Sequence, residues 1–369
     1  MVSPQAAGKL LFLCLSVLSM SNSVYFASTI LHLYAASVIA AERPDEQAHL
    51  VFIDQPEDVE FPLFDIVQQW QQSPFKSVQL FHGRFKGLVN KLKQRKHLFN
   101  QLESVIRDLR PENIFVGNDR RIEFQFSMHI ATSIGCQPIG HYMDEGTYTY
   151  LGREASSAVG DALIDNLAKK FSYGFWWKNP PTIGGSEWIN TVHAAFPDHI
   201  HPLLKHKKSM PLNAAGFSSP AIQELSRLQM DHYGFDHSNL THLDALFTLP
   251  HESLFEKDPG YKKRVLEVIE QLTTSGKLVA AKYHPRNSSP DALGLSEAGV
   301  TLLPASISFE ALLPHLQESC EIWGDVSSTL LIAKWLRREL VVNSIIPDGT
   351  KVTPLSSLFY NIGVKRQGA

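Results

Sequence analysis

Short, uniformly apolar runs alternate with longer amphipathic segments along much of the chain. In the first half, the runs most typical of buried strands are residues 48–54, 77–83, 112–119 and 137–143, most of which end in Gly or Asp. Residues 87–109 carry the apolar spacing of a helix. Strands that alternate with helices predict a parallel, doubly wound α/β sheet.

A second alternating series occupies the last third of the chain. Its predicted strands are residues 244–250, 277–286, 300–305, 320–325 and 339–345, with a helix at 260–276. Between the two series, residues 176–239 are rich in Pro, Gly and His and have little periodicity, which favours a linker or a cleft wall. The pattern therefore predicts two Rossmann-like domains that face a central cleft, residues 1–205 and residues 206–369.

The N-terminal part fits two descriptions. Residues 10–18 are an apolar run, too short to span a bilayer, that suits a buried first strand. Residues 21–43 then fit a helix with Ser21, Asn22 or Ser23 as its cap. A lysine before the run and small residues after it also outline a secretory signal. We favour the strand, with the signal as the alternative; a mature chain that starts near Ser23 would support the signal.

Composition narrows the function classes. The 369 residues are 44% hydrophobic, which suits two domains of ordinary size. A formal net charge of -3 gives no general attraction to nucleic acid, so we expect no such partner. The three cysteines are far apart in or beside apolar runs, as is typical of reduced core residues in a cytosolic protein. Neither His-Glu-x-x-His nor Cys-x-x-Cys occurs, and we expect residues 199–208, rich in His and Lys, to form a basic surface instead of a zinc site.

One acidic motif follows a predicted strand, where open α/β sheets bind their ligands. Asp144, Glu145 and Gly146 come directly after residues 137–143. Such a sequence is commonly a solvated turn in which glycine supplies a positive φ. The alternative is functional, because a carboxylate at this edge can take a proton from a sugar hydroxyl.

Two further motifs follow strands of the second series. His284 and Pro285 lie between Lys282 and Arg286, and these cations favour an imidazole that contacts a phosphate over an ordinary loop histidine. The pair Ser327-Ser328 lies between residues 320–325 and a predicted helix. Free backbone N–H groups and hydroxyls at a helix start form an anion site as readily as a helix cap.

Taken together, the ordered Asp-Glu-Gly, His-Pro and Ser-Ser motifs resemble those of bacterial sialyltransferases, including the lipooligosaccharide sialyltransferases and the capsular polysialyltransferases. Residues 180–197 are similar to the segment between domains in the polysialyltransferase branch, and the resemblance extends to residues 307–314. The resemblance implies a two-domain GT-B fold. It also implies inverting transfer of sialic acid from CMP-sialic acid to a surface glycan, such as a lipooligosaccharide or capsule, without a metal or another cofactor.

The resemblance assigns catalytic roles to both domains. Asp144, in the acceptor-binding N-terminal domain, would be the general base that takes the proton of the acceptor hydroxyl. Glu145 and Gly146 would support the loop. His284, in the CMP-sugar-binding C-terminal domain, would contact the CMP phosphate and act as the general acid.

The same resemblance assigns the nucleotide contacts. Ser327 and Ser328 would hold the donor phosphate together with the histidine. Glu310 would bind the ribose hydroxyls, Pro285 would lie beside the cytosine, and Lys282 would belong to the same nucleotide-binding group.

The chemistry of the transfer agrees with these residue types. Departure of CMP builds negative charge on the phosphate while the sugar gains oxocarbenium character, so fixed donors and an opposing carboxylate are needed. Metal-dependent nucleotide-sugar enzymes usually hold their ion with Asp-x-Asp, and no such motif ends a predicted strand here.

Two alternatives stay open. The donor could be another CMP-activated sugar, a different nonulosonic acid or Kdo, because the motifs bind CMP and phosphate and not the sugar. The chain could also be a catalytically silent relative that binds glycans. The expected partners are a CMP-sugar and a glycan acceptor, lipid-linked or polyanionic, met in the cytoplasm. The basic half of residues 87–109 fits a solvated helix face, or alternatively a peripheral contact with the inner face of the membrane.

Overall fold

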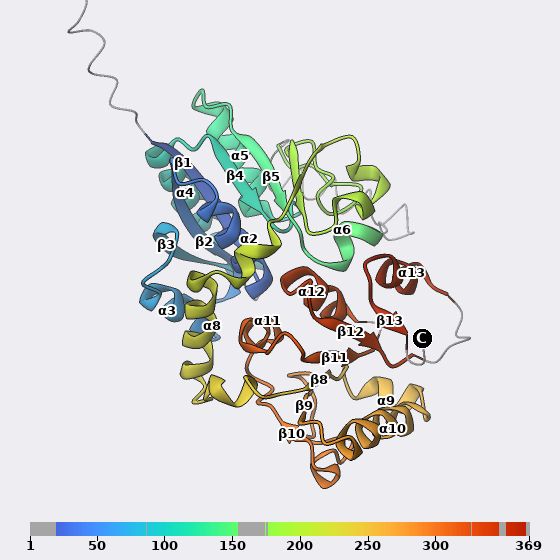
Figure 1. Ribbon diagram of the computed structural model, residues 1–369. Coiled ribbons are helices and arrows are strands. Elements are labelled where there is room, and N and C mark those ends of the chain that lie inside the picture. Colours follow the sequence, from blue (N-terminus) through green and yellow to red (C-terminus); the bar gives the residue numbers. More distant parts are fainter. Residues whose placement is uncertain are drawn as a thin grey trace, which may run out of the picture.

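The computed structural model describes residues 20–85, 87–153, 174, 176–325, 327–346 and 352–366. Two parallel sheets make up the molecule, one in each half of the chain (Figure 1). The first has the order β3-β2-β1-β4-β5-β6-β7. Its strands are β1 (Ser21–Ala27), β2 (Glu46–Pro56), β3 (Phe75–Arg84), β4 (Asn113–Val116), β5 (Ile139–Met143), β6 (Thr191–Ala194) and β7 (Lys208–Pro211).

The second sheet has the order β10-β9-β8-β11-β12-β13. Its strands are β8 (Ala245–Thr248), β9 (Val279–Lys282), β10 (Thr301–Leu302), β11 (Glu321–Gly324), β12 (Val341–Ser344) and β13 (Lys365–Arg366). Neighbouring strands are parallel and helices connect them, because parallel strands need crossover connections. The predicted fold class, two Rossmann-like α/β domains, is confirmed.

The helices follow the apolar spacing of the sequence. They are α2 (Ile30–Ala41), α3 (Pro62–Gln69), α4 (Leu88–Leu109), α5 (Ile122–Ser133), α6 (Thr147–Leu151), α8 (Pro220–His232), α9 (Ser253–Lys257), α10 (Tyr261–Thr274), α11 (Phe309–Leu312), α12 (Ser328–Leu336) and α13 (Pro354–Asn361). In α4 the buried Leu98, Leu102 and Ile106 recur every four residues on one face. Within the described residues, no helix has the length and apolar character needed to cross a membrane.

The N-terminal prediction was wrong in its second half. Ser21–Ala27 is the central strand β1, not the start of a helix, and it pairs with β2 on one side and β4 on the other. Val24, Tyr25 and Phe26 favour a strand, and pairing on both sides buries them almost completely. The helix α2 starts only at Ile30. The apolar run at residues 10–18, predicted as the first strand, lies outside the described residues.

The prediction of a linker or cleft wall at residues 176–239 was also wrong for part of that segment. It contains β6 and β7 of the first sheet and the helix α8. A buried strand of four residues leaves too short a pattern to be recognised in a sequence. The first sheet therefore continues to Pro211, past the expected boundary at 205/206, and the strands of the second begin at Ala245.

Helix α8 joins the two domains. It packs on α3 of the first domain and on α11 of the second (Figure 1). Trp70 Nε1 donates to Ala221 O on α8 over 2.9 Å, and the Ser226 hydroxyl of the same helix donates to Ala311 O. The helices α6 and α13 also meet across the two domains. These helices therefore connect the two domains.

Candidate functional site

Asp144 follows β5 directly and is completely buried. One carboxylate oxygen accepts hydrogen bonds from Gly146 N over 2.9 Å and from Thr149 Oγ1 over 2.7 Å. The other accepts from Ala195 N over 3.0 Å and from the Tyr150 hydroxyl. A carboxylate has about four lone-pair positions, and here four donors use them. Asp144 fixes the loop and has no free acceptor position for a substrate, so the geometry does not suit the role of direct base.

Glu145, the next residue, is arranged differently. Its Oε1 accepts from Asn118 Nδ2 over 3.1 Å, while Oε2 has no partner among the described residues. Burial raises the pKa of Glu145 to about 7, although Arg121 and Arg153 lower it. Oε2 is itself buried, so it lacks a protein partner without being open to solvent. A carboxyl group with one oxygen unpaired among the described residues and a pKa near neutrality is a candidate to accept a proton.

Gly146 has the conformation that its residue type predicts. Its φ is 92°, in the region that favours glycine, and it starts α6. Two residues later Tyr148 has 43% of its surface exposed, and the Arg153 guanidinium lies 5.9 Å from the centre of its ring. An exposed aromatic ring beside Glu145 is a surface on which a sugar ring can stack.

Arginines gather around the ends of the neighbouring strands. Arg84 and Arg121 both bind Asp54 Oδ2, at 2.8 and 2.7 Å. Arg120 donates to Pro180 O over 3.2 Å. The sequence analysis missed these side chains, because single arginines dispersed over several loops form no motif.

In the second domain, the predicted nucleotide-binding residues surround one cavity of about 390 Å³. Its lining includes Lys282, His284, Pro285, Glu310 and Ser328. Ser327, also predicted, is not part of the lining, whereas Thr248 and Thr329 are. The cavity lies at the carboxyl ends of β8 and β9 and at the start of α12, where the open-sheet rule places a ligand.

The hydrogen bonding of His284 fixes its tautomer. Its Nδ1 accepts from Arg286 N over 3.2 Å, so in the neutral ring Nε2 carries the proton. Burial lowers the pKa of His284, with Arg286, His251 and Lys282 adding to the effect. At neutral pH the ring is therefore an uncharged donor, and a bound anion would raise its pKa again.

Lys282 and Glu310 both line this cavity, and each influences the pKa of the other. Lys282 ends β9 and is almost fully buried, and its Nζ donates to Ala305 O over 3.1 Å. Burial lowers the pKa of Lys282 to about 8, and attraction to Glu310 opposes this. Burial raises the pKa of Glu310, and Lys282 opposes that shift. The pair places one positive and one negative group beside the space for a ligand.

The start of α12 is open to an anion. Ser327 occupies the N-cap position, but its side chain makes no capping hydrogen bond to the helix. Its hydroxyl instead lies 2.5 Å from Thr329 Oγ1. The first N–H groups of α12 are thus not taken by the cap side chain, and such groups bind phosphates. Among the described residues, no group of three His, Cys, Asp or Glu side chains is close enough to hold a metal ion.

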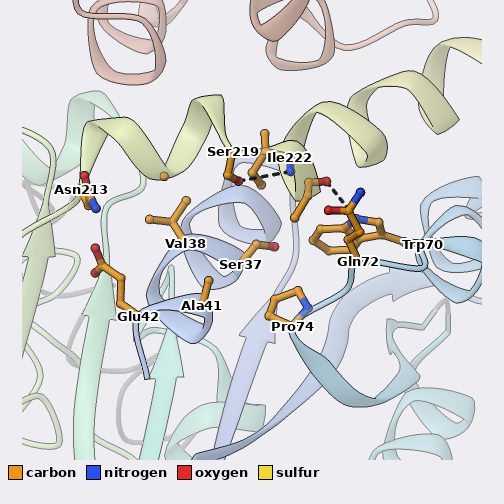
Figure 2. A pocket seen from close by; sticks show the side chains of 12 residues that line it. Ser37, Val38, Ala41, Glu42, Trp70, Gln72, Pro74, Asn213, Ser219 and Ile222 are labelled. Atoms are coloured by element: carbon orange, nitrogen blue, oxygen red, sulfur yellow. Dashed lines mark hydrogen bonds between the residues drawn. The ribbon is translucent and has the colours of Figure 1, made fainter. Parts of the chain in front are cut away.

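A second cavity, of about 240 Å³, lies away from all three motifs (Figure 2). The end of α2, the turn with Trp70 and Pro74, and the start of α8 enclose it. These segments lie near the amino ends of the strands, because Ala41 ends α2 and Pro74 precedes β3. Glu42 is the one ionisable side chain in its lining, so this cavity offers no pair of reacting groups.

The chain was compared with known proteins. Residues 23–344 match the model of the family described as alpha-2,8-polysialyltransferase (POLYST). Comparison with curated protein sequences gave no match.

Solved structures show a similar fold at low sequence identity. An alpha/beta-galactoside alpha-2,3-sialyltransferase from Photobacterium phosphoreum is 15% identical with a TM-score of 0.57, over 94% of this chain and 98% of that one. A UDP-GlcNAc 2-epimerase from Methanocaldococcus jannaschii is 11% identical with a TM-score of 0.54, over 95% and 89% of the two chains. These likenesses show only the fold, because proteins with one fold can have different activities.

The family match covers most of the chain, from β1 to the end of β12, and thus both halves of the site. The chain therefore belongs to the alpha-2,8-polysialyltransferase family and is a glycosyltransferase with the GT-B fold.

Proposed function

We propose that this protein transfers sialic acid from CMP-sialic acid to a hydroxyl group of a glycan, with inversion at the anomeric carbon and without a metal ion. The observation that carries the proposal is the cavity in the second domain. Lys282, His284, Glu310 and the start of α12 all line it. In a chain of this family, that set suits a nucleotide with one phosphate.

In the proposed reaction the oxygen of the acceptor hydroxyl attacks the anomeric carbon of sialic acid. The bond from that carbon to the CMP phosphate breaks, and its electrons leave with CMP. The proton of the hydroxyl passes to a carboxylate of the first domain. Negative charge develops on the phosphate, so donors fixed there before the reaction lower the barrier.

We assign the proton acceptor to Glu145 and a positioning role to Asp144, which exchanges the roles that the family resemblance implied. The free Oε2 of Glu145 and its pKa of about 7 support the exchange. The four hydrogen bonds of Asp144 also support it, because they leave that carboxylate no position to accept a proton.

On the donor side, His284 donates to the phosphate through Nε2. The donor phosphate is a diester with one negative charge, which raises the pKa of His284 in the complex. The second charge that develops as CMP leaves raises this pKa further, so the protonated ring can act as general acid. Lys282 and the N–H groups of α12 add the positive charge that other nucleotide-sugar enzymes take from a divalent ion. This supports metal independence.

The first domain suits an acceptor that carries negative charge. Arg84 is 62% exposed, and Arg121 and Arg153 lie near Glu145. Tyr148 offers an exposed ring beside them. A sialylated glycan has both the sugar ring and the carboxylates that these groups bind. A lipid-linked acceptor and a peripheral membrane contact stay predictions.

The test is release of CMP from CMP-sialic acid by the purified protein, with a sialylated glycan and with or without EDTA. We expect acceptor-dependent release that EDTA does not reduce. His284→Ala should lower kcat/KM about a hundredfold because one donor to the developing charge is lost. The exposed His242 provides the matched control, and His242→Ala should have no effect.

Other outcomes would contradict specific parts of the proposal. Release from CMP-Kdo or another CMP-nonulosonic acid, but not from CMP-sialic acid, would change the donor and keep the site. Loss of activity in EDTA that Mg²⁺ restores would refute metal independence. Binding of CMP without any turnover would refute the proposed reaction.

A further inference from the structure

Three hydroxyl groups at the edge of the donor cavity form a hydrogen-bonded chain, and the sequence motifs include only one of them. Thr248 ends β8, Ser327 precedes α12, and Thr329 lies in the first turn of that helix. Thr248 Oγ1 is 2.9 Å from Thr329 Oγ1, and Ser327 Oγ is 2.5 Å from the same atom. Thr329 is therefore the centre of the chain, with one hydrogen bond on either side.

The three hydroxyl groups have one more proton than their mutual hydrogen bonds use. A hydroxyl supplies one proton and can accept two hydrogen bonds. The three groups have three protons, and the two hydrogen bonds between them use two. Among the described residues, these hydroxyls make no other side-chain hydrogen bond. One proton is left for an acceptor that is not part of the described protein.

The exposed fractions of the three side chains indicate which hydroxyl group donates this proton. Thr248 and Thr329 line the cavity and Ser327 does not. Thr248 is only 5% exposed, whereas Thr329 is partly exposed and sits beside the open N–H groups of α12. Of these three hydroxyls, that of Thr329 is therefore the one that an anion at the helix start meets, next to the exposed Ser328, which also lines the cavity.

We propose that Thr329, and not Ser327, donates the side-chain hydrogen bond to the phosphate of the donor, and that Thr248 and Ser327 position its hydroxyl by donating to it. This inference rests on the proposed function, because the anion is the phosphate of CMP. Either atom can be the donor in each of the two hydrogen bonds, and when both neighbours donate to Thr329 its own proton is the one left for a ligand in the cavity. Hydrogen bonds in such a chain polarise one another and strengthen the last donor.

Gly324 leaves the space that this arrangement needs. It pairs with Thr248 in the register of β11 and β8. A Cβ at position 324 would lie 2.6 Å from Thr248 Oγ1 and 3.0 Å from Leu330 Cδ2. A larger residue would push the hydroxyl of Thr248 away from Thr329. Thr248 is thus a positioning residue, separated in the chain from the motif that it serves.

The test compares the binding of CMP with that of cytidine, which lacks the phosphate. Thr329→Val should weaken CMP binding about tenfold, since a hydrogen bond to a charged group is lost. Thr248→Val keeps the side-chain shape and should weaken CMP binding about threefold, because it acts only through Thr329. Neither change should alter cytidine binding, which also reports an intact fold.

Conservative variants and a control show whether the hydroxyl groups of Thr248 and Thr329 matter, or only the packing of these side chains. Thr329→Ser and Thr248→Ser keep a hydroxyl and should restore most of the CMP affinity. Thr273→Val, on α10, also removes a threonine hydroxyl and should change neither ligand.

The results distinguish this inference from the function it rests on. If the wild type binds CMP more tightly than cytidine and Thr248→Val leaves that ratio unchanged, the role of Thr248 is refuted while the function stands. If Ser327→Ala lowers CMP affinity more than Thr329→Val does, Ser327 is the direct donor and the inference is overturned. A wild type that binds no CMP overturns both.

Discussion

The two sides of the site hold their motif residues in opposite ways. On the proposed donor side, Lys282, His284 and Glu310 line an open cavity. On the proposed acceptor side, Asp144 is saturated by protein donors, whereas the adjacent Glu145 keeps one buried oxygen without a partner among the described residues. The difference teaches that a motif locates a loop, whereas the hydrogen bonds of the folded chain decide which atom is left for a substrate.

The largest expected effect tests the acceptor side. Glu145→Gln removes the proton acceptor but keeps the shape, and should lower kcat about a thousandfold, within the range of general base catalysis. CMP affinity should not change, because Glu145 lies in the other domain. Steady-state CMP release and CMP titration measure the two quantities. A Glu145→Gln enzyme with more than a tenth of wild-type turnover would return the base to Asp144.

The same comparison has a pH signature in the wild type. A base must be ionised, and the pKa of Glu145 is about 7, so the acid limb of kcat/KM should rise with pH up to about 7. Loss of the proton of His284, the proposed general acid, sets the alkaline limb. Arg153 lowers the pKa of Glu145. Arg153→Gln should therefore move the acid limb to higher pH, and a shift in the opposite direction would contradict the assignment.

A smaller effect is expected from Asp144→Asn. In this variant an NH₂ group replaces one carboxylate oxygen and faces a protein donor, so this buried donor loses its acceptor. The loss should lower the unfolding free energy by about 1–3 kcal/mol. Urea unfolding measures this, with the exposed Asp65→Asn as control. Activity should fall because the loop of Glu145 loosens, and low temperature should restore part of it. An Asp144→Asn protein of wild-type stability without activity would favour direct catalysis by Asp144.

The smallest effect concerns the acid stability of β5 and β6. His141 and His193 lie buried in β5 and β6, 3.1 Å apart between Nδ1 and Nε2. Burial lowers their pKa values to about 2 and about 4, with Arg43 and Lys208 lowering both further. The unfolded chain takes up protons near pH 6.5 and the folded chain does not, so stability falls as pH drops below that value.

One pH unit below that point should cost about 1 kcal/mol for each histidine. Glu145 acts in the opposite direction, because its raised pKa makes the folded chain take up a proton between pH 7.5 and pH 5.5 that the unfolded chain does not. The histidine contribution is therefore measured against His193→Gln, which keeps a hydrogen-bonding side chain that does not titrate. Hydrogen exchange at pH 7.5 and pH 5.5, corrected for intrinsic rates, should show that acid speeds the opening of β5 and β6 more in the wild type than in His193→Gln, and equal acid sensitivity of the two proteins would refute this account.

Much of the architecture could be predicted because its signals are local. Residues 48–54, 77–83 and 244–250 are apolar runs of strand length, and all three are strands. The errors have a common cause. Ser21–Ala27 and Thr191–Ala194 are strands through pairing with segments far away in sequence, which no local period reports.

The site, like the fold, has features that local sequence predicts and features that depend on distant contacts. The sequence by itself determined that Asp-Glu-Gly, His-Pro and Ser-Ser follow strand ends, the edge at which parallel sheets bind ligands. Only the tertiary structure decided that Asp144 is bound by Ala195 and Tyr150 and that Thr248 meets Thr329. The physical reason is that hydrogen-bond saturation and burial depend on contacts between distant segments, which exist only once the sheets have formed.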